Sequence, residues 1–126
     1  MILVIGGAYQ GKLDYVKETY QIEEHEIEYL SEDTEELNFS SKVFYGFDKW
    51  LLGGLKRGIP IENYVNQMKE KLADKIIICE DHSCGVVPID NIMRQYREVC
   101  GRVEISLAKD AKSVIRVFLG IGSTIK

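Results

Sequence analysis

The chain has 126 residues, of which 45% are hydrophobic and 29% charged, and its formal net charge is −4. This length and composition are typical of one soluble globular domain, so we expect a single domain over residues 1–126. The net negative charge and the lack of a basic run argue against a nucleic-acid partner. No apolar run is long enough to suggest a membrane-spanning helix. The three widely spaced cysteines favour a cytoplasmic location.

The predicted elements alternate between strands and helices along the chain. In chain order they are a strand over residues 1–5, a helix over 11–20, strands over 27–30 and 42–47, helices over 48–56 and 60–73, a buried strand over 75–79, a long helix over 90–110 and a last strand over 114–119. Asp48 is expected to cap the helix that follows it. Such alternation predicts an α/β fold with a mostly parallel sheet and helices on both faces.

The first strand leads into a glycine-rich loop that ends in a lysine. Its spacing, G-x-x-x-x-G-K, is that of a phosphate-binding loop, and a helical pattern follows at once. Such a loop turns its backbone N–H groups toward phosphate oxygens, and the helix N-terminus adds positive potential. The expected phosphate-contacting residues are Gly6, Gly7, Ala8, Tyr9, Gln10, Gly11, Lys12 and Leu13. The expected architecture is therefore P-loop NTPase-like.

Leu13 stands where a phosphate-binding loop usually offers a Ser or Thr hydroxyl to Mg²⁺. The loop therefore predicts phosphate binding more strongly than phosphoryl transfer, in which Lys12 would reach the β- and γ-phosphates. Carboxylates at the ends of neighbouring strands are the remaining candidates for holding Mg²⁺, and these are Asp48 and the acidic pair at 80–81. We accordingly expect Lys12 as a catalytic residue and Asp48 as a metal ligand.

Three segments are expected to meet at one site, because ligands bind outside the carboxyl ends of the strands in an open parallel sheet. They are the loop at 6–12, the region 45–49 and the stretch 80–85. Interpretations without a ligand stay open. The loop could be an ordinary turn that carries a solvated lysine, and the acidic residues could be a charged strand end. A zinc site from Cys79, His82 and Cys84 is a further alternative, although structural zinc needs a fourth ligand.

The loop at 6–12 is one of two blocks that together resemble a known family. The second block comprises Gly85-Val86-Val87-Pro88, Arg94-Gln95-Tyr96-Arg97-Glu98, Gly101-Arg102, Leu107-Ala108, Gly120-Ile121 and Ile125-Lys126. The loop is similar to an opening G-G-A-R-S-G-K-S, and the second block to G-I-V-P, R-x-F-R-D, G-R-x-N-Q-x-L-A and a terminal G-I-P…L-K, in the same order. In these residues the chain resembles the bifunctional adenosylcobinamide kinase / adenosylcobinamide-phosphate guanylyltransferase family of cobalamin biosynthesis.

The resemblance implies several binding partners. It implies GTP or ATP as the nucleotide, Mg²⁺ on its phosphates, cobinamide as a further substrate, and a homo-oligomer. Asp81 matches the family's acidic residue before the G-I-V-P segment, so we expect Asp81 as a second catalytic residue beside Lys12 and as a second metal ligand beside Asp48. A subunit interface could use the apolar residues Trp50, Leu51, Leu52 and Leu55, although the same residues would equally suit a buried helix face.

The chain also departs from the family at functional positions. Leu13 replaces a serine on the magnesium side, and the aspartate expected after the third strand falls near Tyr45-Gly46. The histidine that becomes guanylylated in the family has no counterpart, because no histidine lies between residues 30 and 42 and His25 precedes the second strand. We expect a shortened nucleotide-binding member in which kinase-type phosphoryl transfer could remain and guanylyl transfer is lost. The alternative is a non-catalytic nucleotide-sensing or assembly protein on the same scaffold.

Overall fold

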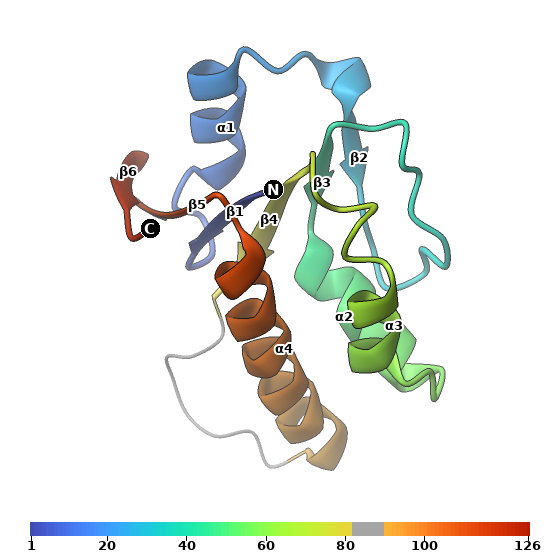
Figure 1. Ribbon diagram of the computed structural model, residues 1–126. Helices are drawn as coiled ribbons and strands as arrows, with labels where there is room; N and C mark the ends of the chain where they lie inside the picture. The colour runs from blue at the N-terminus through green and yellow to red at the C-terminus, as the bar shows by residue number, and fades with distance from the viewer. Residues whose placement is uncertain (82–89) are drawn as a thin grey trace.

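The computed structural model describes residues 1–81 and 90–126, which form a six-stranded sheet flanked by helices (Figure 1). Its strands are β1 (Ile2–Gly6), β2 (Ile27–Tyr29), β3 (Val43–Tyr45), β4 (Ile76–Glu80), β5 (Ser113–Phe118) and β6 (Ile121–Thr124). They lie in the order β2-β3-β4-β1-β5-β6, and all neighbours are parallel except β5 and β6. The predicted α/β fold with a mostly parallel sheet is confirmed.

Helices cover both faces of this sheet (Figure 1). They are α1 (Lys12–Tyr20), α2 (Phe47–Lys56), α3 (Ile61–Gln67) and α4 (Asn91–Asp110), with a 3₁₀ turn at Glu24–Glu26. Val4 of β1 shares an apolar cluster with Val16 of α1, whereas Leu3 belongs to the cluster formed with α2, α3 and α4. Adjacent residues of β1 thus face opposite layers, as successive side chains in a strand do. Within the described ranges, no helix combines the length and the apolar character needed to cross a bilayer.

The carboxyl ends of the central strands meet at one edge of the sheet. The parallel register places Gly6 of β1 beside Glu80 of β4, and Tyr45 of β3 beside Ile78. The backbone N–H of Asp81 donates to the carbonyl oxygen of Gly6 at 2.7 Å, which extends the pairing by one residue. This edge therefore brings together the beginnings of the three segments predicted to form the site.

Helix α2 begins at Phe47, one residue earlier than predicted, because Gly46 forms its N-terminal boundary. Gly46 has a φ of +83°, and a β-carbon there would lie 2.9 Å from the carbonyl oxygen of Leu30. Asp48 lies inside the first turn, is only 4% exposed, and accepts a hydrogen bond from the backbone N–H of Glu80 at 3.2 Å. The predicted N-cap at Asp48 is wrong, since this carboxylate fixes α2 to the end of β4.

Helix α3 ends at Gln67, well before the predicted end at residue 73. The turns that follow are held by shorter-range bonds, such as those from Lys71 N–H to Met68 O and from Lys75 N–H to Leu72 O. Met68 and Leu72 are nevertheless buried, so the apolar spacing of the helix continues beyond its end. Hydrophobic periodicity alone cannot locate this boundary.

Strand β6 was not predicted, and it forms a hairpin with β5. Leu119 and Gly120 have φ values of 52° and 75° between the paired residues Phe118 and Ile121. Positive φ at both central residues is the geometry of a two-residue type I′ turn, which usually carries Asn-Gly or Asp-Gly. Leucine rarely adopts this conformation, so the pair lacks the usual hairpin signal.

The apolar side chains of α2 belong to the interior. Trp50 and Leu51 are each 1% exposed, Leu52 is 9% exposed, and Leu55 is partly buried against the same cluster. Their interpretation as a buried helix face is confirmed, and they do not offer a free surface for a second subunit.

Candidate phosphate-binding site

The glycine-rich loop crosses from β1 to α1 in close contact with the last hairpin. Gly11 precedes α1 with a φ of +83°, and a β-carbon there would lie 3.3 Å from Cα of Gly120. A β-carbon on Gly6 would lie 2.5 Å from the carbonyl oxygen of Val117 in β5. Both ends of the motif therefore need glycine for packing, whatever ligand the loop binds.

Gln10 fastens this loop to the β5–β6 turn. Its side-chain Oε1 accepts a hydrogen bond from Leu119 N–H at 2.8 Å, and its backbone oxygen accepts one from Gly120 N–H at 2.8 Å. The preceding residue, Tyr9, has a φ of 59° and a fully exposed side chain. The chain itself thus sets the shape of the loop and turns Tyr9 outward.

Lys12 opens helix α1 and points back over the loop. It is 8% exposed, and its Nζ donates to the carbonyl oxygen of Gly7 at 2.6 Å. Burial lowers the pKa of Lys12, and the carboxylates of Glu80 and Asp48 oppose that shift. A negatively charged ligand would also favour the protonated form of Lys12. The largely desolvated ammonium is therefore suited to binding a phosphate.

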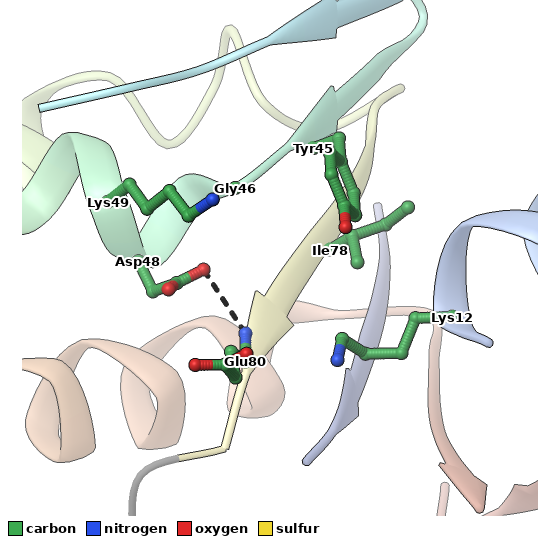
Figure 2. A pocket seen from close by; sticks show the side chains of 7 residues that line it. All are labelled: Lys12, Tyr45, Gly46, Asp48, Lys49, Ile78 and Glu80. Carbon is green, nitrogen blue, oxygen red and sulfur yellow. Dashed lines mark hydrogen bonds between the residues drawn. The ribbon is translucent and has the colours of Figure 1, made fainter. Parts of the chain in front are cut away.

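Across a small cavity of about 40 Å³, Lys12 faces side chains from β3, α2 and β4 (Figure 2). The lining includes Lys12 on the loop side, Tyr45, Asp48 and Lys49 on the β3–α2 side, and Ile78 and Glu80 on β4. The bond from the Glu80 backbone N–H to Asp48 fixes the two acidic residues at this wall (Figure 2). Two lysines and two carboxylates therefore converge from α1, α2 and β4.

A larger cleft of about 570 Å³ adjoins this cavity. Residues 8–14 of the loop and of the start of α1 form one side, and Tyr45, Lys49 and Glu80 contribute to the other. Its volume falls within the range of roughly 300–1,000 Å³ that is usual for small-molecule sites. The predicted loop residues from Ala8 to Leu13 all line this cleft, while Gly7 contributes the carbonyl that accepts from Lys12.

Of the two predicted acidic residues, Asp48 lines the cavity and Asp81 does not. Glu80, the residue before Asp81, lines it instead. The carboxylate of Asp81 still raises the pKa of Lys12, although it is the last of the four raising influences. Side chains two apart in a strand share a face, and Ile78 and Glu80 both line the cavity. This period of two is the sequence signal that would have identified Glu80.

Leu13 is directed partly to the interior. Its side chain is half-buried and packs against the apolar cluster beneath α1 that contains Val16. It therefore contributes to the core at the position where a loop hydroxyl would contact Mg²⁺, and it offers no oxygen ligand.

The oxygen donors at the site suit Mg²⁺ only in combination with a ligand. Asp48 and Glu80 supply hard carboxylate oxygens, which are the protein ligands that Mg²⁺ prefers. Within residues 1–81 and 90–126, no group of three or more His, Cys, Asp or Glu side chains could hold a metal ion. One or two carboxylates fit a Mg²⁺ that keeps waters and binds through phosphates.

The zinc alternative gains no support from Cys79. Its thiol is fully buried in the cluster with α4, and burial raises its pKa well above the usual value, which disfavours the thiolate that binds zinc. His82 and Cys84, the other proposed ligands, lie outside the described residues.

His25 lies far from the candidate site in the topology of the sheet. It belongs to the 3₁₀ turn that precedes β2, and its Nδ1 lies 3.3 Å from a carboxylate oxygen of Glu23. That turn is at the amino ends of the parallel strands, whereas Lys12 and Glu80 lie at the carboxyl ends. His25 is therefore placed away from any ligand of the loop.

Comparison with known families adds evidence from the C-terminal part of the chain. The family model CobU, cobinamide kinase / cobinamide phosphate guanyltransferase, matches residues 55–125, which is more than half of the sequence. The matched region contains α3, β4, α4 and the hairpin, and it includes the segment 85–88, which lies outside the described residues. Comparison with curated proteins found none that matches. The chain belongs to the cobinamide kinase / cobinamide phosphate guanyltransferase family of cobalamin biosynthesis.

Proposed function

We propose that this protein binds a nucleoside triphosphate, GTP or ATP, with its phosphates against the loop at 6–12. The observation that carries the proposal is the cavity shared by Lys12, Asp48 and Glu80 at the carboxyl ends of the parallel strands. Loop amides and the N-terminus of α1 would contact phosphate oxygens, and Lys12 would leave the Gly7 carbonyl to bind them. Family membership supports a nucleotide as the ligand.

Kinase-type phosphoryl transfer is the reaction that the remaining groups suit. Its catalysis consists largely of positioning and of stabilising charge on the transferred group. Lys12 would stabilise the phosphoryl oxygens, and Asp81 or Asp48, together with Glu80, would orient the waters of a phosphate-bound Mg²⁺. The family supports cobinamide as the acceptor.

Guanylyl transfer is proposed to be lost. A covalent nucleotide intermediate needs a nucleophilic side chain next to the bound phosphates. The segment between residues 30 and 42 has no histidine, and His25 lies at the opposite end of the strands. The second function, non-catalytic nucleotide sensing or assembly, is favoured by Leu13, which removes the usual hydroxyl ligand of Mg²⁺.

Calorimetric titration with GTP and ATP, with and without Mg²⁺, tests these proposals. We expect Lys12→Ala to weaken nucleotide binding about tenfold or more, because it removes a charge-assisted contact to phosphate. Lys17→Ala is the matched control, since Lys17 lies on the same helix and pairs with Glu24. Equal affinities of wild type and Lys12→Ala would contradict the proposed role of the loop.

Turnover separates the two functions. Phosphorylation of cobinamide that requires Mg²⁺ and is lost in Lys12→Ala would support the kinase. Nucleotide binding without turnover would favour the sensing protein, and a wild type that binds neither nucleotide would overturn both functions.

We also propose a homo-oligomer, and its support comes from the hairpin. Phe118, Leu119 and Ile121 are 59%, 71% and 70% exposed, and they lie together at the β5–β6 turn. The edge strand β6 also presents backbone groups that a further strand could pair with. This surface replaces the apolar face of α2 as the candidate interface.

A further inference from the structure

Lys49 is a second lysine at the candidate site, and it approaches from the wall opposite Lys12. It lies in the first turn of α2 and contributes to the lining of both the small cavity and the larger cleft. Its stem folds back along the start of the helix, with Cδ 3.7 Å from the position of a β-carbon on Gly46. Figure 2 shows the amines of Lys49 and Lys12 both pointing toward the space between them.

The amine of Lys49 has no protein partner within residues 1–81 and 90–126. Several other lysines of this part of the chain are engaged, for example Lys56 with Glu32 at 2.6 Å and Lys69 with Asp110 at 2.8 Å. Lys49 lies beside the acidic wall formed by Asp48 and Glu80, yet it makes no ion pair with either. A flexible ammonium directed into a cavity without a partner is available to an anionic ligand.

Among the described residues, the loop side of the site supplies few positive charges to bind a triphosphate. Leu13 offers no oxygen to Mg²⁺, and the carboxylates of Asp48 and Glu80 would repel phosphate oxygens when no metal is bound. Lys12 is the one lysine that the loop motif itself supplies. A positively charged side chain on the wall opposite Lys12 would offset this repulsion at the terminal phosphate.

We propose that Lys49 is a second phosphate-binding residue that contacts the terminal phosphate of a nucleoside triphosphate from the side opposite Lys12. The two lysines then hold the polyphosphate from both sides. Because Lys49 supplies a second positive charge, nucleotide binding depends less on Mg²⁺ than it would with Lys12 alone. The inference rests on the proposed nucleotide binding and deepens it by assigning the residue that distinguishes a triphosphate from a diphosphate.

Calorimetric titration of Lys49→Ala with ATP and ADP, in EDTA and in Mg²⁺, tests this assignment. In EDTA we expect about tenfold weaker binding of ATP and little change for ADP, because one charge-assisted contact to the terminal phosphate is lost. Mg²⁺ should restore part of the affinity of the variant, and Lys49→Arg should retain ATP binding. Alanine is a good helix former at an exposed position, so the variant should fold normally.

The matched control is Lys56→Ala, which removes the same charge from the other end of α2. Unchanged ATP binding in Lys49→Ala, or an equal loss for ATP and ADP, would overturn the role of Lys49. If Lys12→Ala still weakens binding in that case, the proposed function stands without this inference. A wild type that binds no nucleotide would overturn both.

Discussion

Two helical glycines show how the surroundings of a single residue decide its role. A β-carbon on Gly53 of α2 would lie 2.0 Å from the backbone oxygen of Glu32, whereas one on Gly101 of α4 would meet nothing within 4 Å. We expect Gly53→Ala to lower the free energy of unfolding by about 2 kcal/mol or more, because backbone must move. Gly101→Ala should raise it by up to about 1 kcal/mol, since alanine favours the helix.

Urea denaturation followed by circular dichroism measures both glycine variants under the same conditions. They serve as controls for each other, because each adds one methyl group within a helix. A stabilised Gly53→Ala variant would show that α2 does not press against residue 32 as described.

At this scale the sequence predicts the residues that belong to a linear motif and misses those defined by contact. Lys12 follows from the loop spacing, and Asp48 from its place after a strand. Glu80 and Lys49 belong to no motif, and they join the site through strand parity and the first turn of α2. Asp81 is selected through its match to the family's acidic residue, whereas β4 ends at Glu80 and the side chain of Glu80 lines the cavity.

Among the elements, the loop and the hairpin form a unit joined by Gln10. We expect Gln10→Ala to remove the acceptor for Leu119 N–H and to speed hydrogen exchange at that amide about fivefold, since such a bond contributes about 1 kcal/mol. The Gly120 amide should be less affected, because it donates to the backbone oxygen of residue 10.

Exchange measured by NMR on the ligand-free protein checks this prediction. Gln10→Glu is the control, because a carboxylate keeps an acceptor at the same position. Equal exchange rates at Leu119 in the alanine variant and the wild type would show that the side-chain bond does not hold the turn.

Strong apolar runs in the sequence predict most of the helices and strands. The ends of these elements are harder to predict. The buried strand β4 and the long helix α4 lie within one residue of their predicted bounds. Helix α3 was overextended because Met68 and Leu72 keep helical spacing in non-helical turns. Strand β6 was missed because Leu119 adopts a positive φ that is sustained by its contact with Gln10, which lies far away in the sequence.

For the molecule as a whole, the proposed homo-oligomer gives a prediction about mass. We expect the double variant Phe118→Ser, Ile121→Ser to shift the protein toward monomers in sedimentation velocity, because it removes two exposed apolar side chains from the hairpin. Ile105→Ser is the control, since Ile105 is 60% exposed on α4, away from the hairpin. A mass that is unchanged in the double variant would exclude the hairpin as the subunit interface.

The position of β1 in the sheet has a consequence for biosynthesis. This first strand pairs on one side with β4 and on the other with β5, whose register begins at Ser113. During synthesis on the ribosome, β1 emerges long before β4 and β5, the two strands with which it pairs. Apolar strands that stay unpaired in this way are prone to aggregation. A nascent chain that stalls before residue 113 therefore carries the glycine-rich loop without the strand and hairpin that support it, and chaperones would be needed there first.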